Sequence, residues 1–213
     1  MEHQEILKID KLTKIYPGGV LANYEISFDI RRGEIHALVG ENGAGKSTLM
    51  KCLFGIEEIT SGQILLNGKP VRFKSTQDAI SHGIGMVQQH FMLFSSMTVA
   101  ENIVYNNELR KGFFLDMEAN RARVRELSAR YGLRVDPDAV VEDCPVGTQQ
   151  RMEILKTLYQ SADIIIFDEP SAVLTPLEVA DLLDTVRRLA EMGKSIILIT
   201  HKLGEVMQVS AHV

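Results

Sequence analysis

The sequence predicts an α/β protein: a P-loop nucleotide-binding core with an antiparallel β subdomain and a helical insertion. Three observations support this prediction. Strands and helices alternate at both ends of the 213-residue chain. A glycine-rich loop over residues 40–48 lies between a strand and a helix. A mostly helical block, residues 90–161, separates the two parts of the core, residues 1–89 and 162–213.

The individual elements follow from hydrophobic periodicity and from turn residues. Strands are predicted at residues 6–15, 26–30, 34–39, 84–87, 164–167 and 195–200. Helices are predicted at 48–54, from 79, around 121–127, at 149–159 and at 176–191. The first two strands are expected to pair antiparallel across a turn at 17–19, and Asn67-Gly68 is a pair favoured in tight hairpins. Gly193 is expected to end the last helix.

The composition is that of an ordinary globular protein and narrows the choice of partners. The net charge of −5 argues against a nucleic-acid partner, because contact with phosphate backbones normally requires a basic surface. No apolar run reaches the roughly 18 residues of a membrane span. Residues 1–5 lack the features of a signal peptide, so a cytoplasmic location is expected. Cys52 and Cys144 match no metal or redox spacing and are expected to be free thiols.

The chain is organised around a glycine-rich segment that fits the pattern G-x-x-x-x-G-K-[ST] at every fixed position. Glycine lets backbone N–H groups turn inward around an anion, and the N-terminus of the following helix adds partial positive charge. Lys46 is expected to reach the β- and γ-phosphates, and Ser47 to offer its hydroxyl to Mg²⁺. The segment expected to hold a nucleoside triphosphate comprises Gly40, Asn42, Gly43, Ala44, Gly45, Lys46, Ser47 and Thr48.

A second motif is an apolar strand that ends in two carboxylates, Asp168 and Glu169. Asp168 is expected to hold Mg²⁺ directly or through water. Glu169 could polarise the attacking water as a general base. His201 also follows a buried strand, and ligands of open α/β sheets bind at such carboxyl ends.

With these motifs in place, the chain resembles the nucleotide-binding domain of an ATP-binding-cassette (ABC) transporter over nearly its whole length, residues 1–213. The resemblance implies that the ligands are ATP and Mg²⁺. Tyr16, which lies 24 residues before Gly40, would stack on adenine. Gln89 would contact Mg²⁺ or water, with Gln88 as the competing choice, and His201 would contact the γ-phosphate. The implied catalytic residues are Lys46, Gln89, Glu169 and His201, and the implied metal ligands are Ser47, Gln89 and Asp168.

The phrases VQQHFMLF, TVAEN and EPSAVLTPLE look most like the importers of simple sugars and nucleosides. This resemblance implies an ATPase subunit on the cytoplasmic face of the cell membrane. Its partners would be transmembrane permease subunits and, indirectly, an extracytoplasmic solute-binding protein. Residues 90–94 would either receive a coupling helix of the permease or fill the core of the helical subdomain, and these alternatives are equally weighted.

Two departures from the family pattern affect how this chain would pair with a second nucleotide-binding domain. Where the family reads LSGGQ, this chain has Pro145, which offers neither a hydroxyl nor an N–H group. Gly147 keeps its backbone donor, and a helix from Gln149 would keep its dipole, so some anion binding is expected to survive. Thr175 stands where the family commonly has an aspartate. The signature segment facing a partner's ATP is Pro145, Val146, Gly147, Thr148 and Gln149.

The resemblance also implies a second ABC domain, expected in the C-terminal half of the same polypeptide, because family domains continue beyond the position of Val213. The chain is therefore expected to be a truncated first half. The main alternative is a soluble ABC-type ATPase that acts on ribosomes or nucleic acid. A P-loop kinase would give no reason for the Asp168-Glu169 pair with His201 beyond it.

Overall fold

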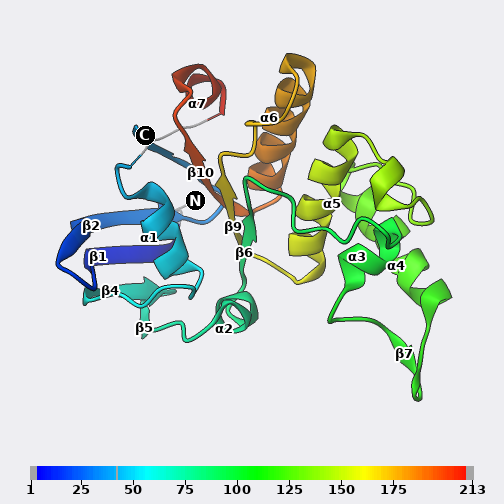
Figure 1. Ribbon diagram of the computed structural model, residues 1–213, viewed down its shortest axis with the longest axis horizontal. Coiled ribbons are helices and arrows are strands. Elements are labelled where there is room, and N and C mark those ends of the chain that lie inside the picture. Colours follow the sequence, from blue (N-terminus) through cyan, green and yellow to red (C-terminus); the bar gives the residue numbers. More distant parts are fainter. Residues whose placement is uncertain (1–3, 42, 210–213) are drawn as a thin grey trace.

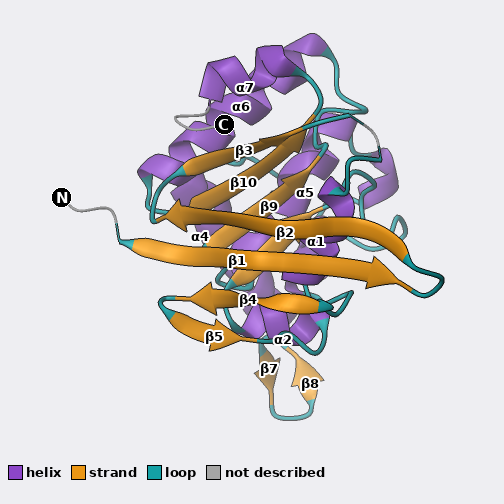
Figure 2. Ribbon diagram, turned by 90° about the vertical axis from the view of Figure 1, so that its left-hand side faces the viewer, coloured by secondary structure: helices purple, strands orange, loops and turns teal. Residues whose placement is uncertain are grey.

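Two four-stranded β-sheets form the centre of the computed structural model, which describes residues 4–41 and 43–209 (Figure 1). The antiparallel sheet has the order β2-β1-β4-β5, and the parallel sheet has the order β3-β10-β9-β6 (Figure 2). The first sheet comprises β1 (Glu5–Tyr16), β2 (Val20–Arg31), β4 (Ser61–Leu66) and β5 (Lys69–Val71). The second comprises β3 (Ile35–Val39), β6 (Ile84–Val87), β9 (Ile164–Asp168) and β10 (Ser195–Thr200).

The parallel sheet is buried on both faces, and its side chains alternate between two hydrophobic clusters. Ile165 and Phe167 of β9 face one cluster, whereas Ile164 and Ile166 face the other. The first cluster includes residues of α3 (Val99–Val104), α4 (Met117–Tyr131), α5 (Val146–Tyr159) and α6 (Pro176–Glu191). The second joins the parallel sheet to α1 (Lys46–Leu53) and to the antiparallel sheet. A sheet covered on both sides explains why β9 and β10 are almost continuously apolar.

The helical block also contains a short β-hairpin, β7 (Arg110–Lys111) with β8 (Phe114–Leu115), which projects from the lower right of Figure 1. Asn120 closes the base of this hairpin, because its side chain donates to Leu109 O and accepts from Leu109 N–H. The remaining elements are α2 (Thr76–Ser81), a 3₁₀ turn at Val141–Asp143 and α7 (Leu203–Val209).

Most of the predicted elements are confirmed, and the differences have tertiary causes. β1 and β2 pair antiparallel, and Asn67 and Gly68 form the predicted hairpin with φ of 50° and 74°. The predicted strand at 26–30 is too short, because β2 pairs with β1 from Val20 onward. The predicted helix at 149–159 begins too late, because α5 starts at Val146 and Gly147 lies in its first turn. The hairpin inside the helical block was not predicted.

The antiparallel sheet holds the first turn of α1 through Gly45, the N-cap of that helix. Gly45 has a φ of 87°, and Asn23 of β2 donates from Nδ2 to Gly45 O over 3.2 Å. A Cβ at Gly45 would overlap Ala22 O and lie 2.7 Å from Asn23 Nδ2. Gly43 has the same φ of 87°, but a Cβ there would meet nothing within 4 Å. The two glycines therefore share a backbone requirement and differ in their surroundings.

Gly45→Ala is expected to lower the free energy of unfolding more than Gly43→Ala. Both substitutions force an L-residue into the left-handed region, at a cost of about 1–2 kcal/mol. Only the methyl group at position 45 also pushes α1 away from β2. Urea unfolding of the two variants and of the unsubstituted chain measures this difference. Equal losses in the two variants would show that β2 does not hold the loop closely.

Glu153 of α5 fastens residues 88–94 to the helical block although its side chain is buried. Its Oε1 accepts a hydrogen bond of 2.5 Å from Met92 N–H. Lys156, one turn further along α5, donates to Met92 O over 2.9 Å. Burial raises the pKa of the Glu153 carboxyl, and Lys156 opposes this rise only in part. A raised pKa means that the ionised form of Glu153 destabilises the folded state relative to the neutral form.

Glu153→Gln is expected to be more stable than the unsubstituted chain at neutral pH. The amide keeps an acceptor for Met92 N–H and removes the buried charge. Because the folded-state pKa lies above the unfolded value, this advantage should shrink as the pH falls through the folded-state pKa and vanish below the unfolded value. Thermal unfolding at a series of pH values measures the change. Glu153→Ala provides the contrast and should be less stable than Glu153→Gln by about 1–3 kcal/mol at every pH, because it leaves Met92 N–H without its acceptor.

Candidate functional site

The four parallel strands end at one edge of their sheet, and each end carries a sequence motif. In sheet order, β3 runs into the glycine-rich loop, β10 into His201, β9 into Asp168 and Glu169, and β6 into Gln88 and Gln89. The strands pair in parallel and in register, so their carboxyl ends lie together. Ligands of open α/β sheets bind at this edge. The fold thus gathers motifs that lie up to 161 positions apart in the chain, from Gly40 to His201.

The glycine-rich loop wraps around the ammonium group of Lys46. Lys46 Nζ donates to Gly40 O over 2.6 Å and to Glu41 O over 2.8 Å, and the residue is only 8% exposed. The positive φ angles of Gly43 and Gly45 give the loop its curvature. Ser47 is exposed in the first turn of α1, Thr48 is half-buried, and Gly43 and Ala44 are exposed. Asn42 lies outside the described residues.

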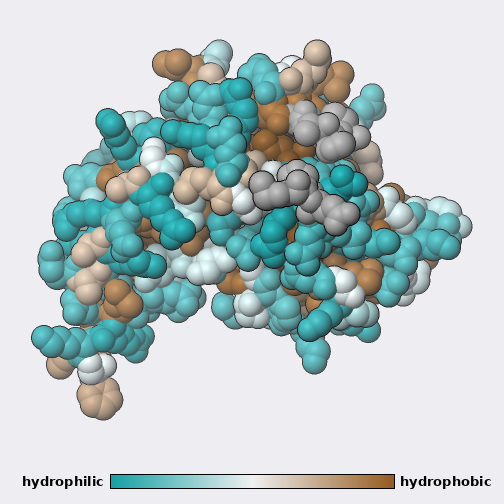
Figure 3. Space-filling view, turned by 180° about the vertical axis from the view of Figure 1, so that it is seen from behind, coloured by the Kyte–Doolittle hydropathy of each residue, from teal (hydrophilic) through white to brown (hydrophobic). Residues whose placement is uncertain are grey.

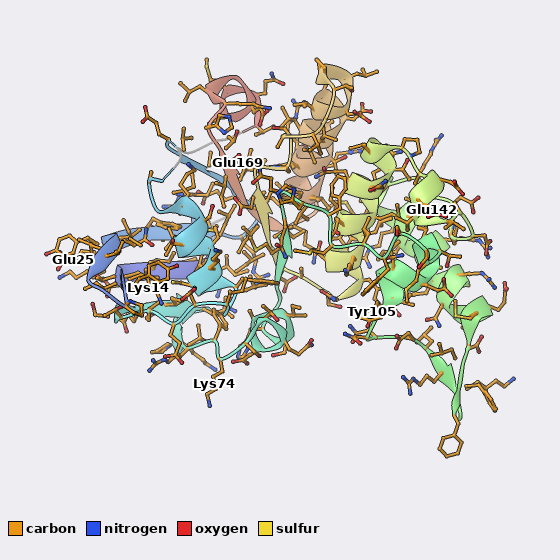
Figure 4. All side chains as sticks on the ribbon, in the orientation of Figure 1. Lys14, Glu25, Lys74, Tyr105, Glu142 and Glu169 are labelled. Atoms are coloured by element: carbon orange, nitrogen blue, oxygen red, sulfur yellow. The ribbon has the colours of Figure 1, made fainter. Side chains whose placement is uncertain are left out.

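The two carboxylates at the end of β9, Asp168 and Glu169, lie in different surroundings. Asp168 is half-buried, and burial, followed by the neighbouring charge of Glu169, raises its pKa, whereas Lys46 and Lys51 oppose the rise. Glu169 adopts a positive φ of 46°, an unusual conformation for a residue other than glycine, and its N–H donates to Ile199 O over 3.0 Å. That hydrogen bond ties the turn after β9 to β10. Figure 4 labels Glu169 at this edge of the sheet.

His201 lies directly against Glu169, with His201 Nδ1 3.3 Å from Glu169 Oε1. The His201 side chain is 48% exposed and that of Glu169 is 17% exposed, so the pair is open to a ligand on the histidine side. Two residues that are 32 positions apart in the sequence are thereby joined. This pairing supports the sequence-based assignment of both residues to one site.

A buried polar network fixes the loops that carry this pair. Glu205 of α7 is only 6% exposed, and its two carboxylate oxygens accept from Ser171 Oγ over 2.7 Å and from Thr200 Oγ1 over 3.1 Å. Lys202 Nζ lies 3.3 Å from Glu205 Oε1 and donates to Ser171 Oγ over 3.1 Å. The network connects the turn after Glu169 with the turn that holds His201. It therefore restrains the two turns that carry Glu169 and His201.

Tyr16 and Gln89 occupy the flanks of the site. Tyr16 is the last residue of β1 and is half-buried. Lys14 Nζ lies 4.8 Å from the centroid of its ring. Lys14 in turn contacts Glu57, beyond α1, over 2.9 Å, so the ring is tied to the segment that follows the phosphate loop. Gln89 is exposed and Gln88 is half-buried in the turn after β6. The greater exposure of Gln89 favours it as the residue that meets a ligand.

The donors at this edge fit a magnesium ion that arrives with a nucleotide. Across residues 4–41 and 43–209, no cluster of three or more His, Cys, Asp or Glu side chains could hold a metal by itself. Mg²⁺ commonly binds through one or two carboxylates together with substrate phosphates and water. The Ser47 hydroxyl and the Asp168 carboxylate supply that kind of incomplete set. The raised pKa of Asp168 is also the response expected of a half-buried carboxylate that lies beside a second one.

The signature segment lies away from these residues, at the start of α5, and the backbone N–H groups of Gly147, Thr148 and Gln149 donate within the chain. Thr148 N–H and Gln149 N–H both donate to Pro145 O, over 2.8 and 3.0 Å. Gly147 N–H donates to Glu178 Oε1 over 3.0 Å. Gly147 keeps its backbone donor, and in this conformation the carboxylate of Glu178, on α6, accepts its hydrogen bond.

Sequence reasoning missed four residues that hold the site in place, namely Asn23, Glu153, Glu178 and Glu205. One signal was available for Glu178, because Thr175-Pro-Leu-Glu178 fits a capping box and forms one here. No local pattern marks the other three. Each contacts a residue that is distant in the sequence, so only the fold brings the partners together.

Comparison with known proteins places the chain in a family. A family model described as "ABC transporter" matches residues 24–172. The chain is 50% identical to the nucleoside import ATP-binding protein NupA of Lactococcus lactis, over 99% of this chain and 41% of that protein. It is 49% identical to the guanosine import ATP-binding protein NupO of Bacillus subtilis, over 90% of this chain and 38% of that protein. The chain thus spans about two fifths of the length of these curated relatives.

Solved structures agree with the fold. The structure of cbiO1 from Clostridium perfringens, described as part of the ABC transporter complex cbiONQ, superposes with a TM-score of 0.82. It is 30% identical and covers 97% of this chain and 82% of its own. Within the described ranges, no helix has the length and apolar character needed to cross a membrane. Because the family model covers more than half of the chain and the relatives match almost all of it, the chain belongs to the ABC transporter family.

Proposed function

We propose that the chain binds ATP with Mg²⁺ and hydrolyses it as the ATP-binding part of an importer for a small solute, a simple sugar or a nucleoside. The observation that carries this proposal is the meeting of four motifs at the carboxyl ends of β3, β10, β9 and β6. The names of the relatives support the class of solute, because they describe import proteins for a nucleoside, guanosine and xylose. The alternative action on ribosomes or nucleic acid has no comparable support.

The geometry supports a division of labour among the residues. Lys46 would exchange its contacts with two loop carbonyl oxygens for contacts with phosphate oxygens, which keeps its charge satisfied throughout. Ser47 and Asp168 would hold Mg²⁺, which neutralises phosphate charge when bound. Glu169 would accept a proton from the attacking water, and His201, held at 3.3 Å from it, would orient that carboxylate and face the γ-phosphate. Gln89 would contact Mg²⁺ or water, and Tyr16 would contact the adenine.

Pairing with a second ABC domain is part of the proposal. Pro145 offers no hydroxyl to a partner's γ-phosphate, and a single such donor is worth about 2.7–4 kcal/mol in comparable sites. A pair formed by two copies of this chain would contain that defect twice. We therefore expect a second domain with a better signature to be the natural partner. The location would be the cytoplasmic face of the membrane, next to permease subunits.

A candidate contact surface for the permease follows the turn after Gln89. Met92 is 54% exposed and Phe94 is 45% exposed, and the Phe94 ring lies 4.9 Å from that of Tyr105, which Figure 4 labels. Phe91 and Leu93 are half-buried, and Leu93 packs against the core. Exposure of Met92 and Phe94 favours docking over core filling for these two residues. Methionine and aromatic side chains suit an adaptable surface for a helix.

Glu169→Gln is expected to slow ATP hydrolysis about 10²–10⁴-fold while ATP binding survives, because general-base assistance has this magnitude. The amide keeps the shape of the side chain and can still contact His201. Steady-state phosphate release and equilibrium ATP binding measure the two effects. Glu191→Gln, the same change at the exposed end of α6, is the matched control and should leave both unchanged. An unaltered turnover in Glu169→Gln would move the general base to another residue.

Met92→Ser combined with Phe94→Ser is expected to abolish co-purification with the membrane permease, because it removes the two large apolar side chains that are exposed among residues 90–94. ATP binding should remain, since neither side chain lies at the phosphate loop. Met207→Ser, at a methionine that is 86% exposed on α7, is the matched control for loss of a surface methionine. If the double variant unfolds, the two side chains belong to the core of the helical block instead.

A further inference from the structure

The Glu178 carboxylate joins the first turns of two helices. Its Oε2 accepts from Thr175 N–H over 2.9 Å and from Thr175 Oγ1 over 2.8 Å, which completes the capping box of α6. Its Oε1 accepts from Gly147 N–H over 3.0 Å, in the first turn of α5. Each oxygen of one side chain therefore serves a different helix.

The two helices that Glu178 joins belong to different nucleotide half-sites. The segment before α6 begins at Glu169, the proposed general base of the site built on the phosphate loop. The first turn of α5 is the signature segment, which would face the nucleotide held by a partner domain. A change at either site can therefore reach the other through a single carboxylate.

At the N-terminus of α5, the Glu178 carboxylate lies where an anionic ligand would bind. Helix N-termini attract negative charge through their free N–H groups and their dipole. Gly147 provides the space, because a Cβ at that position would lie 2.7 Å from Glu178 Oε1 and 3.2 Å from Glu178 Cγ. Thr148 N–H and Gln149 N–H are committed to Pro145 O, and proline has no N–H group. Glu178 thus holds the Gly147 N–H, a donor that a phosphate oxygen could otherwise use.

An unpaired polar side chain, Gln150, lines the same cavity as Glu178. Gln150 is 3% exposed, and neither its Nε2 nor its Oε1 has a partner among the described residues. Gly147, Gln150 and Glu178 line the same cavity of 40 Å³ between α5 and α6. An unpaired buried amide is costly, commonly about 1–3 kcal/mol. Once Gly147 N–H is released, Gln150 Nε2 would offer the carboxylate another donor from the same cavity.

We propose that Glu178 is an internal competitor of the partner's nucleotide: its carboxylate closes the signature segment in the separate domain and is exchanged for phosphate when two domains close around ATP. This inference rests on the proposed function. The exchange makes dimer closure dependent on release of the α5–α6 contact. It would give the chain a means of resisting closure when the partner domain carries no triphosphate.

The test uses the chain with Glu169→Gln, so that ATP is not consumed while dimers form. Glu178→Gln is added to it, because an amide has one acceptor oxygen and cannot serve both Thr175 and Gly147. Asp184→Asn is the matched control, since it removes one charge from the exposed side of the same helix, where Asp184 contacts Arg187. Sedimentation velocity at a series of ATP concentrations measures dimer formation, and equilibrium binding measures ATP affinity.

The expected result is that Glu178→Gln lowers the ATP concentration for half-maximal dimerisation about threefold to tenfold, the range expected for one competing hydrogen bond. Asp184→Asn should leave it unchanged. Dimerisation that is equal or weaker in Glu178→Gln, with ATP still bound, overturns the inference and leaves Glu178 as a helix cap. ATP-bound chains that stay monomeric in every variant overturn it too. Loss of ATP binding in the Glu169→Gln chain itself would contradict the proposed function as well.

A second measurement keeps the inference testable if Glu178→Gln weakens the fold. The backbone amide of Gly147 gives its own resonance in a ¹⁵N–¹H spectrum. In the chain without nucleotide, that resonance should follow the titration of Glu178, because Gly147 N–H donates to its carboxylate. A Gly147 resonance that does not respond to acid while Glu178 titrates would show that the contact is absent in solution and would overturn the inference.

Discussion

The parallel pairing of β3, β10, β9 and β6 is the constraint on which the rest of the structure depends. Parallel strands must be covered on both faces, and the two hydrophobic clusters provide that cover from opposite sides. Burial of both faces fixes the register, because a shift of one residue would exchange the side chains of the two clusters. A fixed register holds the four carboxyl ends in one line. The candidate site is thus a direct product of core packing, although its own residues are polar.

Polar contacts over long sequence distances then set the positions of the loops at that edge. Asn23 reaches the phosphate loop from the antiparallel sheet, and Glu205 ties Ser171 to Thr200. Glu153 fastens the segment after Gln89 to α5. Each of these side chains is buried and hydrogen-bonded to a loop or turn, which restrains the position of that segment. Movement of α5 relative to the parallel sheet would therefore be felt at Met92 and at Gly147 together.

The electrostatics of the edge suit a ligand that is strongly negative and carries a cation. Lys46 Nζ donates to two carbonyl oxygens, and the raised pKa of Asp168 reflects burial beside Glu169. Phosphate groups would add negative charge beside Lys46, and a divalent cation would add positive charge beside the two carboxylates. At α5 the situation is reversed, since a carboxylate of the same chain already satisfies the helix N-terminus. The phosphate loop would thus receive its anion from the ligand, whereas the signature segment already has one from Glu178 of the same chain.

The sequence by itself determined the α/β class, the phosphate loop, the carboxylates after β9 and the histidine after β10, because each depends on residues that are close together in the chain. It also determined the hairpin at Asn67-Gly68 and the bounds of α6, which turn and capping residues specify locally. Only the tertiary structure decided the strand order, the full length of β2, the start of α5 and the contact between Glu178 and Gly147. These features arise from hydrogen bonds and packing between distant segments. A local pattern of residue types cannot specify them, since the partner that completes each contact lies elsewhere in the chain.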